Sequence, residues 1–378
     1  MSSIHAAYRE AGSEVLQANT FSGNRLSLGA HGLGEEVAAI NRAGVELARG
    51  AADGAWVVAS VGCTGHFLEP AGEMTFEEMY QVFLEQLKEL EGAGASYVHL
   101  ETFTDLAELR AALLAARQGT NLQVLASATF DQGGRTLSGN PAGAIAIVAE
   151  ALGAICVGAN CGGGPDTLIG PVQEMAKVTA LPLMAKANAG LPEIVDGETV
   201  FPMHATDFAA TAPAFLEAGV RLIGGCCGTT PEHIRALGKA IEGQKLVSQP
   251  QTGGNYLCSP YQYVAMEDIE ALPQVDLARK DLHEAASDGD VYALLDAIGE
   301  EATDNALLVD FAGFTQKELI WELMSNLPLS VHVPLVFCAE DDEVLRLALR
   351  YYPGRPGIVH PTPTQRALAE EYGAVVLE

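Results

Sequence analysis

Three cysteines stand where apolar segments give way to glycine-rich turns. Cys226 and Cys227 follow an apolar run and two glycines, and Cys161 follows another apolar run and precedes three glycines. Adjacent side chains on a strand point to opposite faces, so neighbouring thiols can meet only where the strand ends or bends, and glycine permits that bend. Three thiolates with no obvious fourth protein ligand match a catalytic zinc site, which keeps one coordination position open.

Two other interpretations of these cysteines remain open. They could form a closed structural zinc site, or they could be ordinary core cysteines, which are common. Cys63 could reach the same site as an additional ligand, although a buried free thiol is the simpler interpretation. We interpret the other cysteines, Cys156, Cys258 and Cys338, as structural. The histidines, including His233, His332 and His360, show no metal-ligand spacing.

Strand and helix patterns alternate over the first two thirds of the chain. The predicted strands are 14–19, 55–61, 96–101, 122–128, 153–159, 181–187 and 219–224, and the predicted helices are 35–52, 75–93, 104–118, 142–152, 166–179, 205–218 and 231–242. Repeated βα units of this size predict an α/β fold, a (β/α)8 TIM-type barrel. Because only seven strands are found, we expect a barrel that lacks its first strand and has two unpaired edges.

A change of composition divides the chain. Residues 244–256 are rich in Gln, Ser, Pro, Thr and Gly, which is typical of a linker. We therefore predict a barrel domain over 1–243 and a smaller α/β domain over 257–378, similar to half a barrel. In the second domain we expect strands at 306–310, 330–337, 357–360 and 373–377, and helices at 288–303, 315–326, 341–351 and 363–371. Four strands do not close a barrel.

Charge and composition exclude several classes of protein. The formal net charge of -28 disfavours binding to nucleic acid and to anionic membranes. No apolar run reaches the roughly 20 residues that span a bilayer. The seven cysteines form an odd number and follow no signal-peptide-like start, which indicates a reducing, cytoplasmic location.

Three motifs resemble those of the homocysteine S-methyltransferase family. They are Gly-Ala-Asn-Cys at 158–161, Lys-Ala-Asn-Ala-Gly-Leu-Pro at 186–192 and Gly-Gly-Cys-Cys-Gly-Thr-Thr-Pro-Glu-His at 224–233. The resemblance covers about residues 4 to 245. It implies that Cys161, Cys226 and Cys227 bind Zn2+, that homocysteine is the substrate, and that methionine is the product.

The resemblance also implies roles for polar residues at strand ends. Glu101 would bind the substrate amino group, with Thr102 beside it, although an acid at a helix N-terminus is the alternative for Glu101. Asn188, Asn160 and Asn19 would orient the substrate or the groups around the metal, unless they are ordinary turn residues. We thus predict catalytic roles for Glu101 and Asn188, and substrate binding by Glu101, Thr102, Asn19 and Asn160.

The chain departs from the family pattern in several places. Gln17-Ala18 stands where the methionine-synthase branch carries Glu-Thr, and no Asp-Gly-Ala-Met-Gly loop is found. The C-terminal part resembles the first half of a pterin-binding domain at 328–330 and 347–354. Polar residues usual in that domain are replaced at 309–311 and 336–338. We therefore do not expect folate binding.

The resemblance leads to a zinc-dependent transfer of a methyl group to the homocysteine thiol. The pterin-like segment favours the methionine-synthase branch, and no Asp-X-His-X-X-Gly cobalamin signature is found. We therefore predict that the donor is methylcobalamin or another methylcorrinoid on a separate protein, with S-methylmethionine and betaine as alternatives. The alternative function is a catalytically impaired zinc-binding subunit that docks a corrinoid protein or a partner barrel.

Overall fold

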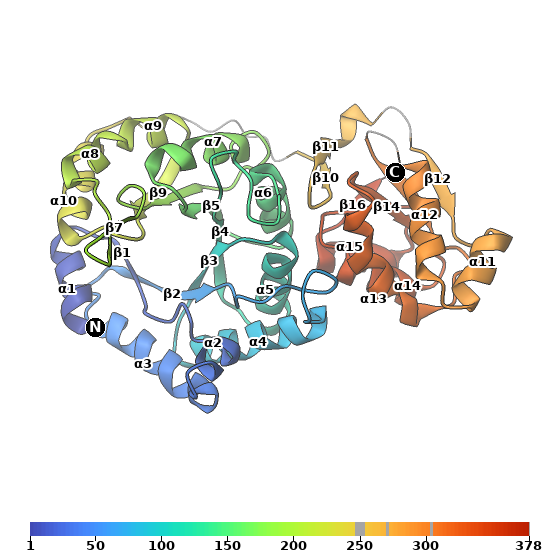
Figure 1. The fold of residues 1–378 in the computed structure, drawn as a ribbon, viewed down its shortest axis with the longest axis horizontal. Helices are drawn as coiled ribbons and strands as arrows, with labels where there is room; N and C mark the ends of the chain where they lie inside the picture. Colours follow the sequence, from blue (N-terminus) through green and yellow to red (C-terminus); the bar gives the residue numbers. More distant parts are fainter. Residues whose placement is uncertain (246–253, 270–271, 303–304, 378) are drawn as a thin grey trace.

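The computed structural model describes residues 1–245, 254–269, 272–302 and 305–377. Its larger part is a curled sheet of seven parallel strands in the order β1-β2-β3-β4-β5-β6-β9, with helices around its outside (Figure 1). The strands are β1 (Val15–Gln17), β2 (Trp56–Gly62), β3 (Tyr97–Phe103), β4 (Gln123–Ala128), β5 (Cys156–Cys161), β6 (Leu183–Ala187) and β9 (Val220–Gly225). The predicted α/β barrel fold is confirmed.

Amphipathic helices alternate with these strands. In α4, Thr75 and Glu78 form a capping box at the N-terminus, and Met79, Phe83 and Leu87 form a buried stripe at helical spacing.

Among the described residues, no helix is both long and apolar enough to cross a membrane. The helices are α1 (Ser2–Glu10), α2 (Arg25–Gly29), η1 (Gly34–Glu36), α3 (Val37–Gly50), α4 (Phe76–Gly92), α5 (Leu106–Gly119), α6 (Ala142–Ala151), α7 (Pro165–Met175), α8 (Ala205–Ala210), α9 (Ala212–Glu217) and α10 (Pro231–Ile241).

The barrel sheet is open between β1 and β9. Within the described ranges, neither of these edge strands pairs with a further strand, in agreement with the expected gap. Helix α1 contacts α3, α10 and β1, and the Tyr8 hydroxyl donates a hydrogen bond to the Thr229 carbonyl at 2.8 Å. Helix α1 therefore covers the outside of the opening (Figure 1). A small antiparallel hairpin, β7 (Glu193–Val195) and β8 (Glu198–Val200), is inserted after β6.

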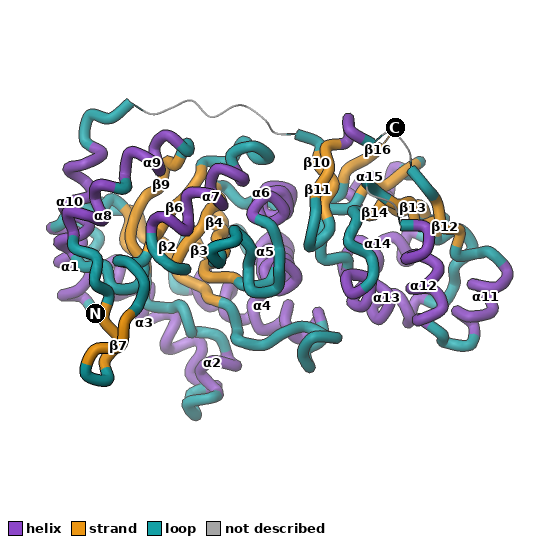
Figure 2. The backbone as a smooth tube through the Cα atoms, turned by 45° about the horizontal axis from the view of Figure 1, so that its top comes forward, coloured by secondary structure: helices purple, strands orange, loops and turns teal. Residues whose placement is uncertain are grey.

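The C-terminal part contains a parallel sheet of five strands in sequential order (Figure 2). The prediction of four strands was wrong because β12 has only three residues, of which Val275 alone is buried, too short a pattern to recognise. The strands are β12 (Gln274–Asp276), β13 (Leu307–Asp310), β14 (Leu335–Cys338), β15 (Gly357–Val359) and β16 (Val375–Leu377). The helices are η2 (Met266–Asp268), α11 (Lys280–Ser287), α12 (Val291–Glu301), η3 (Lys317–Leu319), α13 (Ile320–Asn326), η4 (Leu327–Leu329), α14 (Asp342–Tyr351) and α15 (Pro363–Tyr372).

An antiparallel hairpin, β10 (Tyr256–Cys258) and β11 (Tyr263–Ala265), lies between the two sheets (Figure 2). Strand β10 packs on α6, and Cys258 exchanges two backbone hydrogen bonds with Arg355 at 2.9 and 3.0 Å. Of the predicted linker 244–256, residues 246–253 lie outside the described part of the chain. The domain boundaries themselves stay a prediction.

Side chains from the barrel helices hold the C-terminal part in place. The buried Arg110 of α5 donates to the carbonyl oxygens of Leu349 at 2.6 Å and Arg350 at 2.7 Å, at the end of α14. Arg350 in turn forms an ion pair with Glu77 of α4, with an N–O distance of 2.6 Å. The contact thus joins the two sheets through α4, α5 and α14.

Candidate active site

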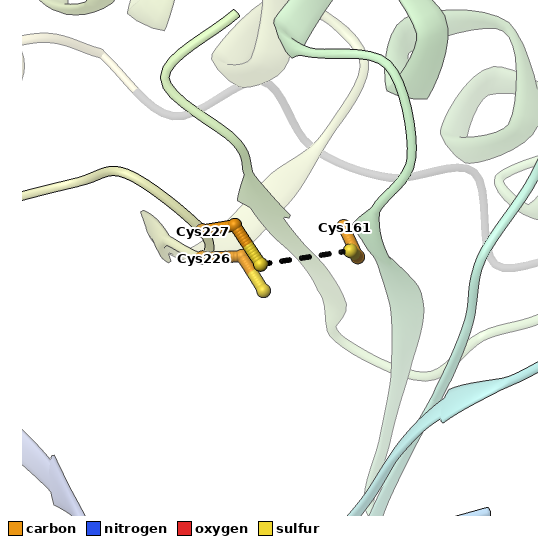
Figure 3. A group of neighbouring side chains, drawn as sticks. All are labelled: Cys161, Cys226 and Cys227. Atoms are coloured by element: carbon orange, nitrogen blue, oxygen red, sulfur yellow. Dashed lines mark hydrogen bonds between the residues drawn. The ribbon is translucent and has the colours of Figure 1, made fainter. Parts of the chain in front are cut away.

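The three cysteines predicted as metal ligands lie together at the carboxyl end of the barrel sheet (Figure 3). Cys161 ends β5, and Cys226 and Cys227 follow the end of β9. Their sulfur atoms all lie within 4.8 Å of one another, and the Sγ atoms of Cys161 and Cys227 are 4.0 Å apart. Strand β6 pairs with both β5 and β9, so the two strand ends are held at a fixed separation.

Backbone turns at both strand ends bring the sulfur atoms together. Cys161 has φ +63°, in the left-handed region that few residues other than glycine occupy. The Cys226 N–H donates to the carbonyl of Ala187 at 2.7 Å, which ties the end of β9 to β6. A Cβ atom at Gly225 would lie 2.3 Å from the Thr229 hydroxyl oxygen, so this tight turn requires glycine.

Hydrogen bonds among the three thiols, together with burial, shift their pKa values. A hydrogen bond from the Cys226 thiol lowers the pKa of Cys161 to about 7, and the same bond, together with burial, raises the pKa of Cys226. Burial also raises the pKa of Cys227. A bound cation would displace these protons, because thiols ligate metals as thiolates.

Two asparagine side chains support the cysteines. The Asn188 amide donates to the Gly162 carbonyl at 2.7 Å and approaches the Cys161 sulfur at 3.7 Å, while its oxygen accepts from the Cys227 N–H at 3.0 Å. The Asn160 amide approaches the Cys226 sulfur at 3.9 Å. Both amides therefore contact the turns that carry the cysteines, and their role in orienting the cluster stays a prediction.

Glu101 lies in a buried polar network inside the barrel. Its carboxylate accepts hydrogen bonds from Gln17 and Ser60 and pairs with the Lys186 ammonium at 2.7 Å; the His99 ring lies 3.5 Å away. Burial alone would raise the pKa of Glu101, but Lys186 and the surrounding hydrogen bonds lower it to about 2. Burial lowers the pKa of His99 to about 3, so this ring is neutral. Glu101 is therefore an ionised carboxylate and not a helix N-terminal acid.

The two remaining predicted substrate-binding residues, Thr102 and Asn19, lie in different surroundings. Thr102 lies beside the cluster through Asn160: its N–H donates to Asn160 Oδ1 at 2.9 Å, and its hydroxyl accepts from Asn160 Nδ2 at 2.7 Å. These bonds, with one from Ser127, occupy the polar groups of the buried Asn160, which suits a positioning role. Asn19 is exposed, and none of the hydrogen bonds among the described residues joins its side chain to the cysteines.

Cys63 does not join the cluster. Burial raises the pKa of this thiol, and among the described residues the possible metal-binding group consists of Cys161, Cys226 and Cys227. His233 caps α10 through Thr230 and contacts the Met203 carbonyl at 3.0 Å. The cluster therefore offers three sulfur ligands and no nitrogen ligand.

Comparison with known proteins gives the family. Residues 1–241 match the homocysteine S-methyltransferase family. The chain belongs to this family. It is 28% identical to the methionine synthase of Mycobacterium tuberculosis (strain ATCC 25618 / H37Rv), over 100% of this chain and 34% of that protein. It is 27% identical to the methionine synthase of Mycobacterium leprae (strain TN), over 94% of this chain and 32% of that protein.

The chain spans about a third of the length of these curated relatives. A solved structure shares the barrel fold: the metallated form of the homocysteine methyltransferase MmuM from Escherichia coli. Its TM-score is 0.54 at 24% sequence identity, and the match covers 62% of this chain and 82% of that chain.

The donor set in this homocysteine S-methyltransferase domain fits a zinc ion. Zn–S bonds of about 2.3 Å in a tetrahedron place sulfur atoms about 3.8 Å apart. The Sγ atoms of Cys161 and Cys227 are 4.0 Å apart, and all three sulfur atoms lie within 4.8 Å of one another, which is close to that value. Small side-chain rotations would complete the geometry, and three protein ligands leave a fourth position for a substrate.

Lys186 is a site residue that the sequence analysis missed. It lies on β6, where it pairs in register with Asn160 of β5 and Gly224 of β9, just below the cysteine-bearing turns. Its position two residues before Asn188, within one family motif, was the available signal, because residues two apart on an extended segment share a face. Ser60 and His99 were missed because single polar residues inside apolar strands carry no spacing signal.

Proposed function

We propose that this homocysteine S-methyltransferase domain transfers a methyl group to the thiol of homocysteine in a zinc-dependent reaction that forms methionine. The observation that carries the proposal is the convergence of three thiols, from β5 and β9, at the carboxyl end of a barrel that belongs to this family. In barrels of this type, the active site lies at that end.

Cys161, Cys226 and Cys227 would hold the metal. A zinc ion bound there would keep a thiol in the open fourth position as a thiolate, which is a far better nucleophile than the thiol at neutral pH. Asn188 and Asn160 hold the cysteine turns in position. Zn2+ and three thiolates together would carry a formal charge of -1, which would favour electron donation by the substrate sulfur.

The substrate amino group is the natural partner of the buried Glu101 carboxylate, with Thr102 beside it. The transfer forms a carbon–sulfur bond and breaks the bond between the methyl group and its donor, and the electron pair of that bond stays with the donor. We propose a methylcorrinoid on a separate protein as the donor, because the curated relatives are methionine synthases of which this chain spans about a third.

A second candidate function is a zinc-binding subunit that docks a corrinoid protein without catalysing the transfer. One observation favours it: Lys186 already occupies the carboxylate that the substrate amino group would use. This candidate predicts bound zinc without methionine.

The test is a turnover assay with purified protein, homocysteine and methylcobalamin, followed by mass-spectrometric detection of methionine. We expect methionine from the wild type and none from Cys226→Ala. Zinc-loaded wild type that forms no methionine with this or the other two donors, S-methylmethionine and betaine, would support the docking function instead.

The seven free cysteines fit a reducing compartment, so we propose a cytoplasmic location.

A further inference from the structure

We infer that Lys186 binds the carboxylate of an α-amino acid substrate while Glu101 and Gln17 receive its ammonium group, so that the internal ion pair selects zwitterionic thiols. This inference rests on the proposed methyl transfer to homocysteine and assigns a recognition site for the end of the substrate remote from sulfur.

The position of Lys186 places it next to the thiol cluster. Asn188, two residues further along the same extended segment, contacts the Cys161 sulfur at 3.7 Å and the Cys227 N–H at 3.0 Å. Residues two apart on such a segment share a face, so Lys186 points to the same interior side, one step deeper in the barrel. In homocysteine, two methylene groups separate the sulfur from the α-carbon. A substrate whose sulfur lies at the cysteine cluster would therefore extend its α-carbon deeper into the barrel, towards Lys186 and Glu101.

The ion pair is built so that its partners can be exchanged. The Lys186 ammonium lies 2.7 Å from Glu101 Oε2 and 2.5 Å from the side-chain oxygen of Gln17. Its side chain is 16% exposed, against 7% for Glu101, so the lysine is the more accessible partner. If the ammonium turns to a substrate carboxylate, it releases two acceptor oxygens, on Glu101 and Gln17, for the substrate ammonium.

Charge balance favours a zwitterion over a ligand with a single charge. The pair is neutral, and inserting an amino acid gives an alternating row of charges: lysine, carboxylate, ammonium and glutamate. A thiol without the carboxylate would leave Lys186 without a partner, and a thiol without the amino group would leave Glu101 without one; an unpaired buried charge is costly. His99, the ring beside Glu101, is neutral and supplies no competing cation.

The experiment compares three thiols by isothermal titration calorimetry on the zinc-loaded protein. The thiols are homocysteine, 3-aminopropane-1-thiol, which lacks the carboxylate, and 4-sulfanylbutanoate, which lacks the amino group. Each analogue lacks the partner of one charge-assisted hydrogen bond, so we expect the wild type to bind homocysteine about 10- to 100-fold more tightly than either analogue.

The Lys186→Met variant should weaken the binding of homocysteine without weakening the binding of 3-aminopropane-1-thiol. We expect it to bind homocysteine about 10- to 100-fold more weakly than the wild type. It should bind 3-aminopropane-1-thiol equally or more tightly, because Glu101 is then free. Lys239→Met removes the same charge from the exposed face of α10 and should change neither affinity.

Two results would overturn the inference: equal affinities of the wild type for homocysteine and 3-aminopropane-1-thiol, or equal weakening of both by Lys186→Met. The first comparison needs no variant and therefore holds even if Lys186→Met does not fold. A wild type that binds none of the three thiols would instead contradict the proposed function itself.

Discussion

The side-chain oxygen of Asn188 accepts a hydrogen bond from the backbone N–H of Cys227 at 3.0 Å. The amide of the same side chain donates to the Gly162 carbonyl at 2.7 Å. One side chain thus joins the turn that carries Cys161 to the turn that carries Cys226 and Cys227. The two turns belong to strands that are not neighbours, so this bridge links them directly, in addition to the pairing of both strands with β6.

Loss of the bridge should weaken metal binding. We expect Asn188→Ala to reduce zinc affinity about 10- to 100-fold, the usual effect of removing a group that orients metal ligands. Competition with a chromophoric zinc chelator measures the change. Asn121→Ala, which removes an exposed asparagine bonded to Glu91, is the control and should leave zinc affinity unchanged. An equal affinity for Asn188→Ala and the wild type would contradict a positioning role.

A buried carboxylate outside the proposed site should make stability depend on pH. Burial raises the pKa of Glu108 to about 7 from an ordinary value of 4.5. Between these pH values the unfolded chain releases a proton that the folded chain keeps, so the folded state loses stability as pH rises. At about 1.36 kcal/mol per pKa unit, the loss is about 3 kcal/mol by pH 8.

Glu108→Gln should remove this loss, since the amide oxygen can still accept from the N–H and hydroxyl of Thr64. Urea unfolding at pH 4 and pH 8 should show that the variant gains stability over the wild type mainly at pH 8.

The lowered pKa of Glu101 has the opposite sign: its contribution to stability is present above pH 4.5 and is lost as pH falls towards 2. Glu101→Gln should therefore lose stability relative to the wild type mainly at neutral pH.

The sequence predicted the barrel strands because most of them contain an apolar run bounded by glycine or polar turns, such as β2 and β4. The grouping of Cys161, Cys226 and Cys227 was predictable for the same reason, since parallel strands end at one edge of a sheet. Strand β12 was missed because Val275 is its only buried residue. Gln17 and Ser60 were missed as partners of Glu101 because they come from strands β1 and β2, and residue spacing does not show which side chains of different strands meet inside a barrel. The spacing of Lys186 to Asn188 on one segment was the only such signal.

The packing of the C-terminal part on the barrel depends on Arg110. This buried guanidinium donates to two carbonyl oxygens at the end of α14, which would be left without partners by Arg110→Met. We expect a loss of about 2–5 kcal/mol in the free energy of unfolding, measured by urea titration and circular dichroism. Zinc binding by protein that remains folded should not change.

Arg117→Met is the matched control, because Arg117 lies on the same helix and donates to the Glu370 carbonyl at 2.9 Å from an exposed position. Its loss should cost less than about 1 kcal/mol. If the two variants lost stability equally, burial of Arg110 at this contact would not be the cause.

Metal content tests the central claim most directly. Mass-spectrometric metal analysis of the purified protein should give about one zinc per chain. Cys226→Ala and Cys227→Ala should each lose it, whereas Cys63→Ala should keep it, because the Cys63 thiol lies outside the cluster. Zinc absent from the wild type, or retained in both cluster variants, would contradict a three-thiolate site and the methyl transfer built on it.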